Sequence, residues 1–135
     1  MQVPKGKKFS LSERLRSFRF AFTGILLAIR TQHNFRIHLT AFALVVASGF
    51  IFGISAAEWC IILLASALVL SLEIINTAME FLVDLFSPEY HEKAGFVKDL
   101  SAAAVLISSA IALVCGLIIF AKYILALFIS SPVIR

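Results

Sequence analysis

Long apolar runs without a charge limit what this chain can fold into. Residues 39–57 form a run of nineteen residues with no charged side chain, which as a helix is just enough to cross roughly 30 Å of hydrocarbon. Residues 59–72 form a second uncharged run of fourteen. Of the 135 residues, 61% are hydrophobic and only 15% are charged, with a mean hydropathy of +0.99. A soluble domain of this size is less apolar, so we expect an all-α membrane protein.

The spacing of apolar residues and the turn signals divide the chain into four expected helices. Ser10 and Glu13 have the spacing of a capping box, and an amphipathic helix over about 10–31 is expected to lie on the membrane surface or to pack onto the rest of the protein. Three spans are expected over about 35–54, 58–86 and 99–121. Ser87 and Pro88 should end the second span, because proline disfavours helical geometry in the residue before it. Asp99 is a candidate cap of the third.

These elements form one expected membrane domain over residues 10–130, preceded by a basic, disordered segment at 1–9 and followed by a tail at 131–135. Eight of the twelve Lys and Arg residues lie at or before Arg36. With the two lysines of the 87–98 loop, ten lie on one side of the spans, and Lys122 and Arg135 lie on the other. The N-terminus and that loop are therefore expected to be cytoplasmic and the C-terminus outside. The basic segment should bind anionic lipid headgroups and not nucleic acid.

Polar residues gather on one face of the second expected span. At 100° per residue, Glu73, Asn76, Thr77, Glu80 and Asp84 fall within about 100° of one another. A carboxylate in hydrocarbon costs about 2.5–3.5 kcal/mol, so this face must meet protein, water, a metal or another subunit. Asn76 or Thr77 alone would be a hydrogen-bonding contact between helices. Glu73 lies deepest, and Glu80 and Asp84 lie toward the cytoplasm, so two separate roles at two depths are expected.

The loop that follows carries a second polar cluster on the same side. Its members lie within eleven residues: Glu89, Tyr90, His91, Glu92, Lys98 and Asp99. Lys98 is suited to phosphate, and Mg²⁺ favours one or two carboxylates together with substrate phosphates. Phosphoryl transfer needs positioning and charge neutralisation more than covalent help from the protein. The two clusters together indicate a site for Mg²⁺ and ATP, although neither a P-loop nor a GxGxxG motif is present.

At this point the sequence resembles a known family, the small bacterial diacylglycerol kinases and undecaprenol kinases. The stretch "EIINTAMEFLVD" is similar to the family signature E-x-x-N-[ST]-[AS]-x-E-x-x-x-D, and "EYHEKAGFVKDLSAAAVL" is similar to its nucleotide loop and third span. The stretch "NFRIHL" is similar to the undecaprenol kinase branch. The resemblance covers about residues 15–120. It implies a homotrimer of three-span subunits in the bacterial cytoplasmic membrane, which transfers phosphate from Mg·ATP to a lipid alcohol, with undecaprenol slightly favoured over diacylglycerol.

The resemblance also implies roles for single residues. Glu73 is implied as the base that takes the proton of the lipid hydroxyl, and Asn76 as a residue that positions groups. Glu80 is implied as a metal ligand. The residues implied to contact the nucleotide are Glu89, Tyr90, His91, Lys98 and Asp99, with Phe20 as a candidate, and the candidates for the lipid are Arg14 and Arg16. His33 and His38 are expected to be interface residues near the headgroups.

One position departs from the family pattern. Gln32 stands where the family usually has a glutamate that helps to hold the metal. Glutamine offers a neutral carbonyl oxygen without the charge, so metal binding is weakened, another acid substitutes, or activity is reduced.

Two other kinds of function are weighed against the lipid kinase. A small oligomeric proton- or cation-coupled transporter would explain Glu73, but it would not explain a nucleotide-like loop. A structural relative with impaired catalysis would explain Gln32. Nucleotide binding separates the kinase from the transporter, and turnover separates it from the impaired relative.

Overall fold

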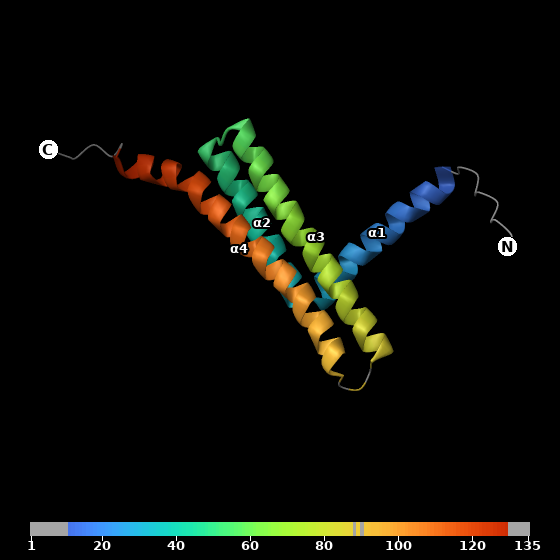
Figure 1. Cartoon of the computed structure of the whole chain (residues 1–135). Helices are drawn as coiled ribbons and strands as arrows, with labels where there is room; N and C mark the ends of the chain where they lie inside the picture. The colour runs from blue at the N-terminus through green and yellow to red at the C-terminus, as the bar shows by residue number, and fades with distance from the viewer. Residues whose placement is uncertain (1–10, 88, 90, 130–135) are drawn as a thin grey trace, which may run out of the picture.

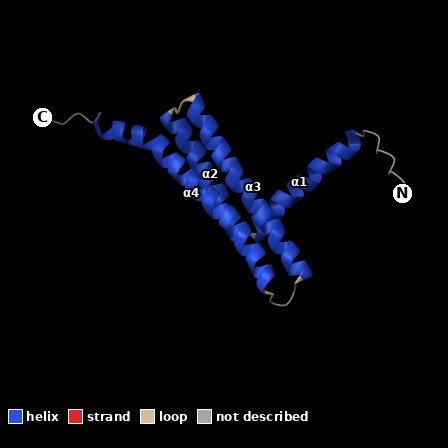
Figure 2. Ribbon diagram, in the orientation of Figure 1, coloured by secondary structure: helices blue, strands red, loops and turns tan. Residues whose placement is uncertain are grey.

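The computed structural model describes residues 11–87, 89 and 91–129, which form four helices and no strand (Figures 1 and 2). They are α1 (Leu11–Thr31), α2 (His33–Phe52), α3 (Ala56–Phe86) and α4 (Glu92–Ile129). The last three are long and apolar enough to cross a membrane. The all-α prediction of three spans and an N-terminal helix is confirmed. The predictions for residues 1–9, for the cap at Ser10 and for the tail at 131–135 lie outside the described residues.

Short connections with non-helical backbones separate the first three helices. Gln32, between α1 and α2, has an extended backbone with φ −105° and ψ 117°. Gly53 ends α2 in the left-handed region at φ 61°, where a side chain would be strained. Ser55 then begins α3 with a capping box, because its side chain accepts from the Glu58 N–H and the Glu58 carboxylate accepts from the Ser55 N–H.

At the 87–91 connection, the end of α3 agrees with the sequence prediction and the start of α4 does not. α3 ends at Phe86, and Ser87, the residue before Pro88, leaves the helical region with φ −136°. α4 begins at Glu92, seven residues before the predicted start of the third span at Asp99. The prediction that Asp99 caps this helix is wrong, because Asp99 lies inside α4. His91 takes that place: its Nδ1 accepts from the Lys93 N–H at 3.2 Å.

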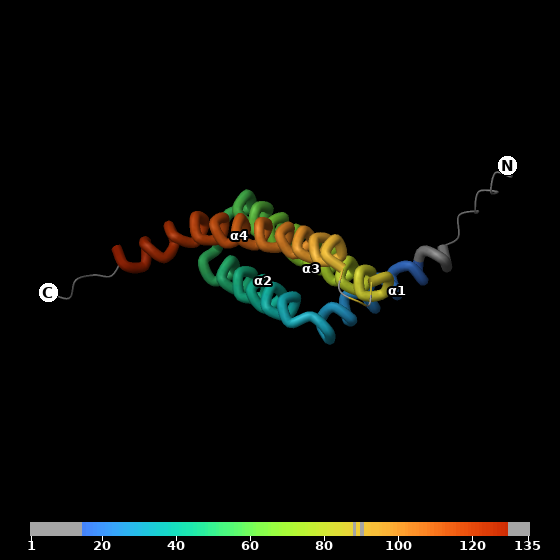
Figure 3. The backbone as a smooth tube through the Cα atoms, turned by 60° about the horizontal axis from the view of Figure 1, so that its bottom comes forward, coloured from blue at the N-terminus to red at the C-terminus, as the bar shows by residue number. Residues whose placement is uncertain are grey.

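α3 is the central helix of the molecule. It packs along α4 over much of its length, and α2 packs against it from another side, as Figure 3 shows. α1 meets α2 and α3 near its C-terminal end and then runs away from the three-helix bundle at a steep angle (Figure 1). A basic helix that leaves the spans at such an angle fits a position along the membrane surface.

The core of one chain is small for its apolar content. Ile54, Ile62 and Ile119 form a buried cluster with Trp59 and Tyr123 against it. Many large apolar side chains point outward from all three long helices, for example Leu64 at 72% exposure and Ile118 at 70%. Such faces are covered by lipid or by other protein in a membrane.

Candidate functional site

The polar face of α3 is buried near the middle of the helix and exposed toward its C-terminal end. Glu73, Asn76 and Thr77 are 3%, 7% and 5% exposed. Glu80 is half-buried, and the Asp84 side chain is 62% exposed. The face predicted from the helical spacing therefore turns toward neighbouring helices, and its two glutamates lie at different depths.

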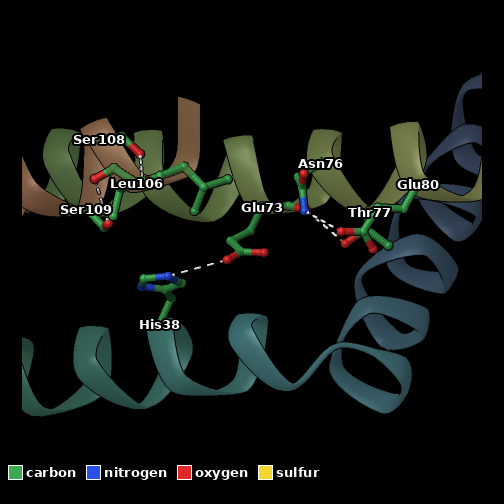
Figure 4. Close-up of polar contacts among 9 residues, drawn as sticks. His38, Glu73, Asn76, Thr77, Glu80, Leu106, Ser108 and Ser109 are labelled. Atoms are coloured by element: carbon green, nitrogen blue, oxygen red, sulfur yellow. Dashed lines mark hydrogen bonds and ion pairs between the residues drawn. The ribbon is translucent and has the colours of Figure 1, made fainter. Parts of the chain in front are cut away.

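The deepest member of this face, Glu73, meets α2. The Nε2 atom of His38 lies 3.4 Å from Glu73 Oε1, as Figure 4 shows. The hydroxyl of Thr77 donates to the main-chain carbonyl of Glu73 at 2.9 Å and not to its carboxylate. Thr77 thus bonds within α3, whereas His38, expected near the headgroups, lies beside the most buried acid.

Asn76 joins α3 to α4. Its Nδ2 donates to Glu80 Oε1 at 2.9 Å (Figure 4), and its Oδ1 accepts from Ser101 Oγ at 2.6 Å. The contact between helices expected of an isolated asparagine is present, and the same amide also fixes one carboxylate oxygen of Glu80. Sequence reasoning missed Ser101, although residues 98, 101, 105 and 108 follow the spacing of one helix face.

The residues near the 87–91 connection lie at the same end of the bundle as Glu80. Lys98 Nζ forms an ion pair with Asp84 Oδ1. Glu89 is exposed, and its main-chain carbonyl accepts from Ser87 Oγ at 3.1 Å. His91 and Asp99 are exposed as well, and Tyr90 lies outside the described residues. α3 and α4 thus bring Lys98 to the polar face, where Asp84 holds it.

Among the described side chains of a single chain, the candidates on α1 and at Gln32 form no hydrogen bond or ion pair with this cluster. Arg16 and Phe20 are exposed and lie in the N-terminal half of α1. The side chain of Arg14 is outside the described residues. Gln32 is half-buried, and its side chain does not cap α2, so its amide is not committed to the helix end. Their roles stay predictions.

The described residues contain no group of three or more His, Cys, Asp or Glu side chains that could hold a metal ion. Glu80 nevertheless has a half-buried carboxylate of which one oxygen is fixed by Asn76. One carboxylate is enough for a Mg²⁺ ion that arrives already bound to phosphates. The site therefore fits a magnesium ion that enters with a nucleotide, and does not fit a resident ion held by protein alone.

An apolar groove of about 950 Å³ runs along α2, α3 and α4. It begins at His38 and continues past small residues, among them Ala65, Ser109 and Gly116, toward Ile124. His38 is therefore shared by the groove and by the contact with Glu73. A long apolar molecule in this groove would have one end beside the polar face of α3.

A polar cluster around Glu58 ties α3 to α4 at the opposite end of the bundle. Glu58 accepts from the hydroxyl of Tyr123 at 2.8 Å and pairs with Lys122 Nζ at 2.6 Å. The Ser55 hydroxyl also donates to it at 2.8 Å. This carboxylate has partners on every side, so it is suited to hold two helices together and not to react.

Comparisons with known proteins find similarity to diacylglycerol kinases and an undecaprenol kinase. The family described as prokaryotic diacylglycerol kinase matches residues 19–120. The undecaprenol kinase of Bacillus subtilis (strain 168) is 38% identical over 116 residues, which cover 86% of this chain and 94% of that protein. The diacylglycerol kinase of Synechocystis sp. is 40% identical over 101 residues, 74% of this chain and 58% of that protein. The diacylglycerol kinase of Escherichia coli (strain K12) is 32% identical over 95 residues, 70% and 78% respectively.

Proposed function

The chain belongs to the prokaryotic diacylglycerol kinase family, and from this premise we propose that it transfers the γ-phosphoryl group of Mg·ATP to undecaprenol at the cytoplasmic surface of the membrane. It is a multi-pass membrane protein and a lipid kinase that uses ATP. The observation that carries the finer proposal is the polar face of α3. It holds a buried carboxylate, Glu73, and a half-buried one, Glu80. Two further members of the face, Asn76 and Asp84, contact Ser101 and Lys98 of α4.

The acceptor is proposed from two observations. The stretch "NFRIHL", which resembles the undecaprenol kinase branch, lies at the start of α2. The Bacillus relative named undecaprenol kinase is matched over 94% of its length. Diacylglycerol is the competing acceptor, because the Synechocystis and Escherichia relatives are named diacylglycerol kinases. The apolar groove that begins at His38 suits the hydrocarbon part of either lipid.

In the proposed mechanism, Glu73 takes the proton of the lipid hydroxyl as general base. The lipid oxygen then forms a bond to the γ-phosphorus, and the bond from that phosphorus to the oxygen of the leaving ADP breaks. Asn76 holds Glu80 in place, and Glu80 would hold the magnesium ion that accompanies ATP, which would neutralise charge on the phosphates. Lys98 leaves Asp84 to pair with the phosphates, which carry more charge than one carboxylate.

The remaining site residues keep their proposed roles. Glu89, Tyr90, His91 and Asp99 are proposed to contact the nucleotide, as the sequence resemblance implies. The candidates on α1 and at the start of α2 are Phe20 for the nucleotide, Arg14 and Arg16 for the lipid, and Gln32 for the metal.

The assembly and orientation are also part of the proposal. The outward apolar faces of α3 and α4 support a homotrimer, and α1 of a neighbouring subunit would then be able to approach the polar face. The excess of basic residues before Arg36 and in the 87–98 loop supports a cytoplasmic N-terminus and site.

The test is phosphate transfer from labelled ATP in mixed micelles that contain Mg²⁺ and either undecaprenol or diacylglycerol. We expect more labelled lipid in the micelles that contain undecaprenol than in those that contain diacylglycerol. Glu73→Gln should abolish transfer, and Glu58→Gln, the same change at the other end of α3, should not. Transfer to diacylglycerol alone would refute the acceptor. Full turnover in Glu73→Gln would refute the assigned base.

Inactivity of the unaltered protein needs a second variant to be interpreted. If Gln32→Glu restores transfer, the family fold is present and its metal site is impaired. If neither protein transfers phosphate, the kinase proposal fails and a proton- or cation-coupled transporter becomes the better explanation of Glu73.

A further inference from the structure

We propose that His38 is the positioning residue for Glu73: its imidazole holds the buried carboxylate in the orientation in which it receives the proton of the acceptor hydroxyl. This inference rests on the proposed function, in which Glu73 is the base. His38 lies on α2, outside both the polar face of α3 and the 87–91 connection.

The first support is the isolation of the Glu73 carboxylate. Its side chain is 3% exposed, so water does not solvate it freely. Among the residues that the structure describes, His38 is the one cationic or imidazole side chain within ion-pair distance, at 3.4 Å. Glu80, an acid on the same face of α3, is hydrogen-bonded to Asn76 instead. A buried carboxylate with few donors is costly, and the imidazole is the group that offsets this cost.

The second support is the geometry of the ring. Nε2 faces Glu73, and the other ring nitrogen points away from it, as Figure 4 shows. For Nε2 to be attracted to a carboxylate oxygen it must carry a hydrogen, which leaves Nδ1 of the neutral ring as an acceptor. A fixed partner of this kind restricts the side-chain torsions of a glutamate, which otherwise has several rotamers.

The third support is the position of His38 between the apolar groove and the acid. His38 lines the groove at the end where its contact with Glu73 lies, and Glu73 itself is not part of the lining. A lipid hydroxyl that enters from the groove therefore meets His38 before Glu73. The imidazole is thus placed to orient the carboxylate toward that hydroxyl.

The competing explanation is that His38 only packs α2 against α3. Both explanations predict a loss of activity on substitution if the fold is disturbed, so activity alone does not separate them. A positioning role predicts a loss in kcat that depends on the carboxylate at position 73. A packing role predicts a loss of stability that does not depend on it.

The test compares His38→Ala and His38→Gln with His33→Gln, a histidine on the same helix that contacts Arg36. We expect kcat to fall about 10- to 100-fold in His38→Ala, a part of the roughly 10²–10⁴-fold that a general base contributes. The KM values for ATP and lipid should change less than threefold. His38→Gln, whose amide can still donate to Glu73, should recover part of the loss, and His33→Gln should match the unaltered protein.

A double-mutant cycle with Glu73→Asp gives the decisive readout. The shorter side chain withdraws from the ring, so His38→Ala should cost much less kcat in that background than in the unaltered protein. Equal losses in both backgrounds would overturn the proposal. So would unchanged kcat in His38→Ala, or a loss explained by unfolded protein in size-exclusion chromatography and circular dichroism.

A measurement without turnover separates failure of this inference from failure of the proposed function. The ¹⁵N chemical shifts of the His38 ring, measured by NMR in micelles, should change in Glu73→Gln and stay nearly constant in Glu58→Gln. If neither the unaltered protein nor Gln32→Glu transfers phosphate, the proposed function fails, while these shifts still report the contact between His38 and Glu73. If the ring shifts of His38 do not change in Glu73→Gln, the role assigned to His38 is overturned, whether or not the protein transfers phosphate.

Discussion

Ser101→Ala tests the link between α3 and α4 at the candidate site. The hydroxyl of Ser101 lies 2.6 Å from Asn76 Oδ1 on α3 and 2.9 Å from the main-chain carbonyl of Lys98 on its own helix. Ser109 is a matched control, because it lies on the same helix and donates to the carbonyl of Leu106 at 3.0 Å, three residues back in the same way. The two serines differ chiefly in the contact with Asn76.

The size of the effect follows from that contact. A hydroxyl has one hydrogen to donate, and the shorter distance favours Asn76 over the Lys98 carbonyl. Hydrogen bonds between membrane helices contribute about 0.6 kcal/mol on average and up to about 1.7 kcal/mol. Because Asn76 is 7% exposed, no water replaces the lost donor readily, and we expect a loss of about 1–1.5 kcal/mol in the free energy of unfolding.

The assay is unfolding by a denaturing detergent in mixed micelles, followed by circular dichroism. All variants are compared at one protein concentration, because subunit association affects the apparent stability. Ser109→Ala should lie within about 0.5 kcal/mol of the unaltered protein. In Asn76→Ala the serine has already lost its partner, so Ser101→Ala should add little there. Equal losses from the two serine variants, or additive losses at 76 and 101, would refute the link.

Three further changes test other parts of the molecule. Gly49→Ala should destabilise the protein by about 1–3 kcal/mol in the same unfolding assay, because the new Cβ would lie 2.7 Å from Trp59 Cη2; unchanged stability would contradict this packing. Tyr123→Phe should lower the thermal midpoint and leave kinase turnover intact, since it removes the 2.8 Å bond to Glu58 far from Glu73; a loss of turnover without a loss of stability would contradict it. Gln32→Glu should lower the Mg²⁺ concentration needed for half-maximal turnover, because a carboxylate adds charge next to the ion; an unchanged magnesium requirement would remove Gln32 from the metal site.

The parts of the structure that depend on local spacing could be predicted from the sequence. Glu73, Asn76 and Glu80 share one face because helical geometry fixes their angles, and the left-handed Gly53 and the backbone of Ser87 end their helices near the expected positions. The start of α4 could not be predicted from hydropathy. The apolar run indicates which part of a helix is suited to hydrocarbon. α4 begins before that run, at the charged Glu92, where His91 supplies an acceptor.

The partners of the polar face could not be predicted for a different reason. A helical period indicates which residues share a face, but not which neighbouring helix that face meets or at what height. The contact of His38 with Glu73 depends on how α2 is rotated against α3. The contact of Ser101 with Asn76 depends on how far α4 is shifted along α3. Lys98 was expected to be available for phosphate, and its pairing with Asp84 follows from the same shift.

Polar contacts at both ends of the bundle together fix the alignment of α3 and α4. Asn76 and Ser101 join the helices at one end, and Glu58 and Tyr123 join them at the other. Along α3 the two contacts are about 27 Å apart, and along α4 about 33 Å, at 1.5 Å per residue. Sliding one helix past the other would break both at once. α2 differs, because among the described residues its one polar side-chain contact with α3 is that of His38 with Glu73. A shift of α2 would therefore change the surroundings of Glu73 while Asn76 and Glu80 stay in place.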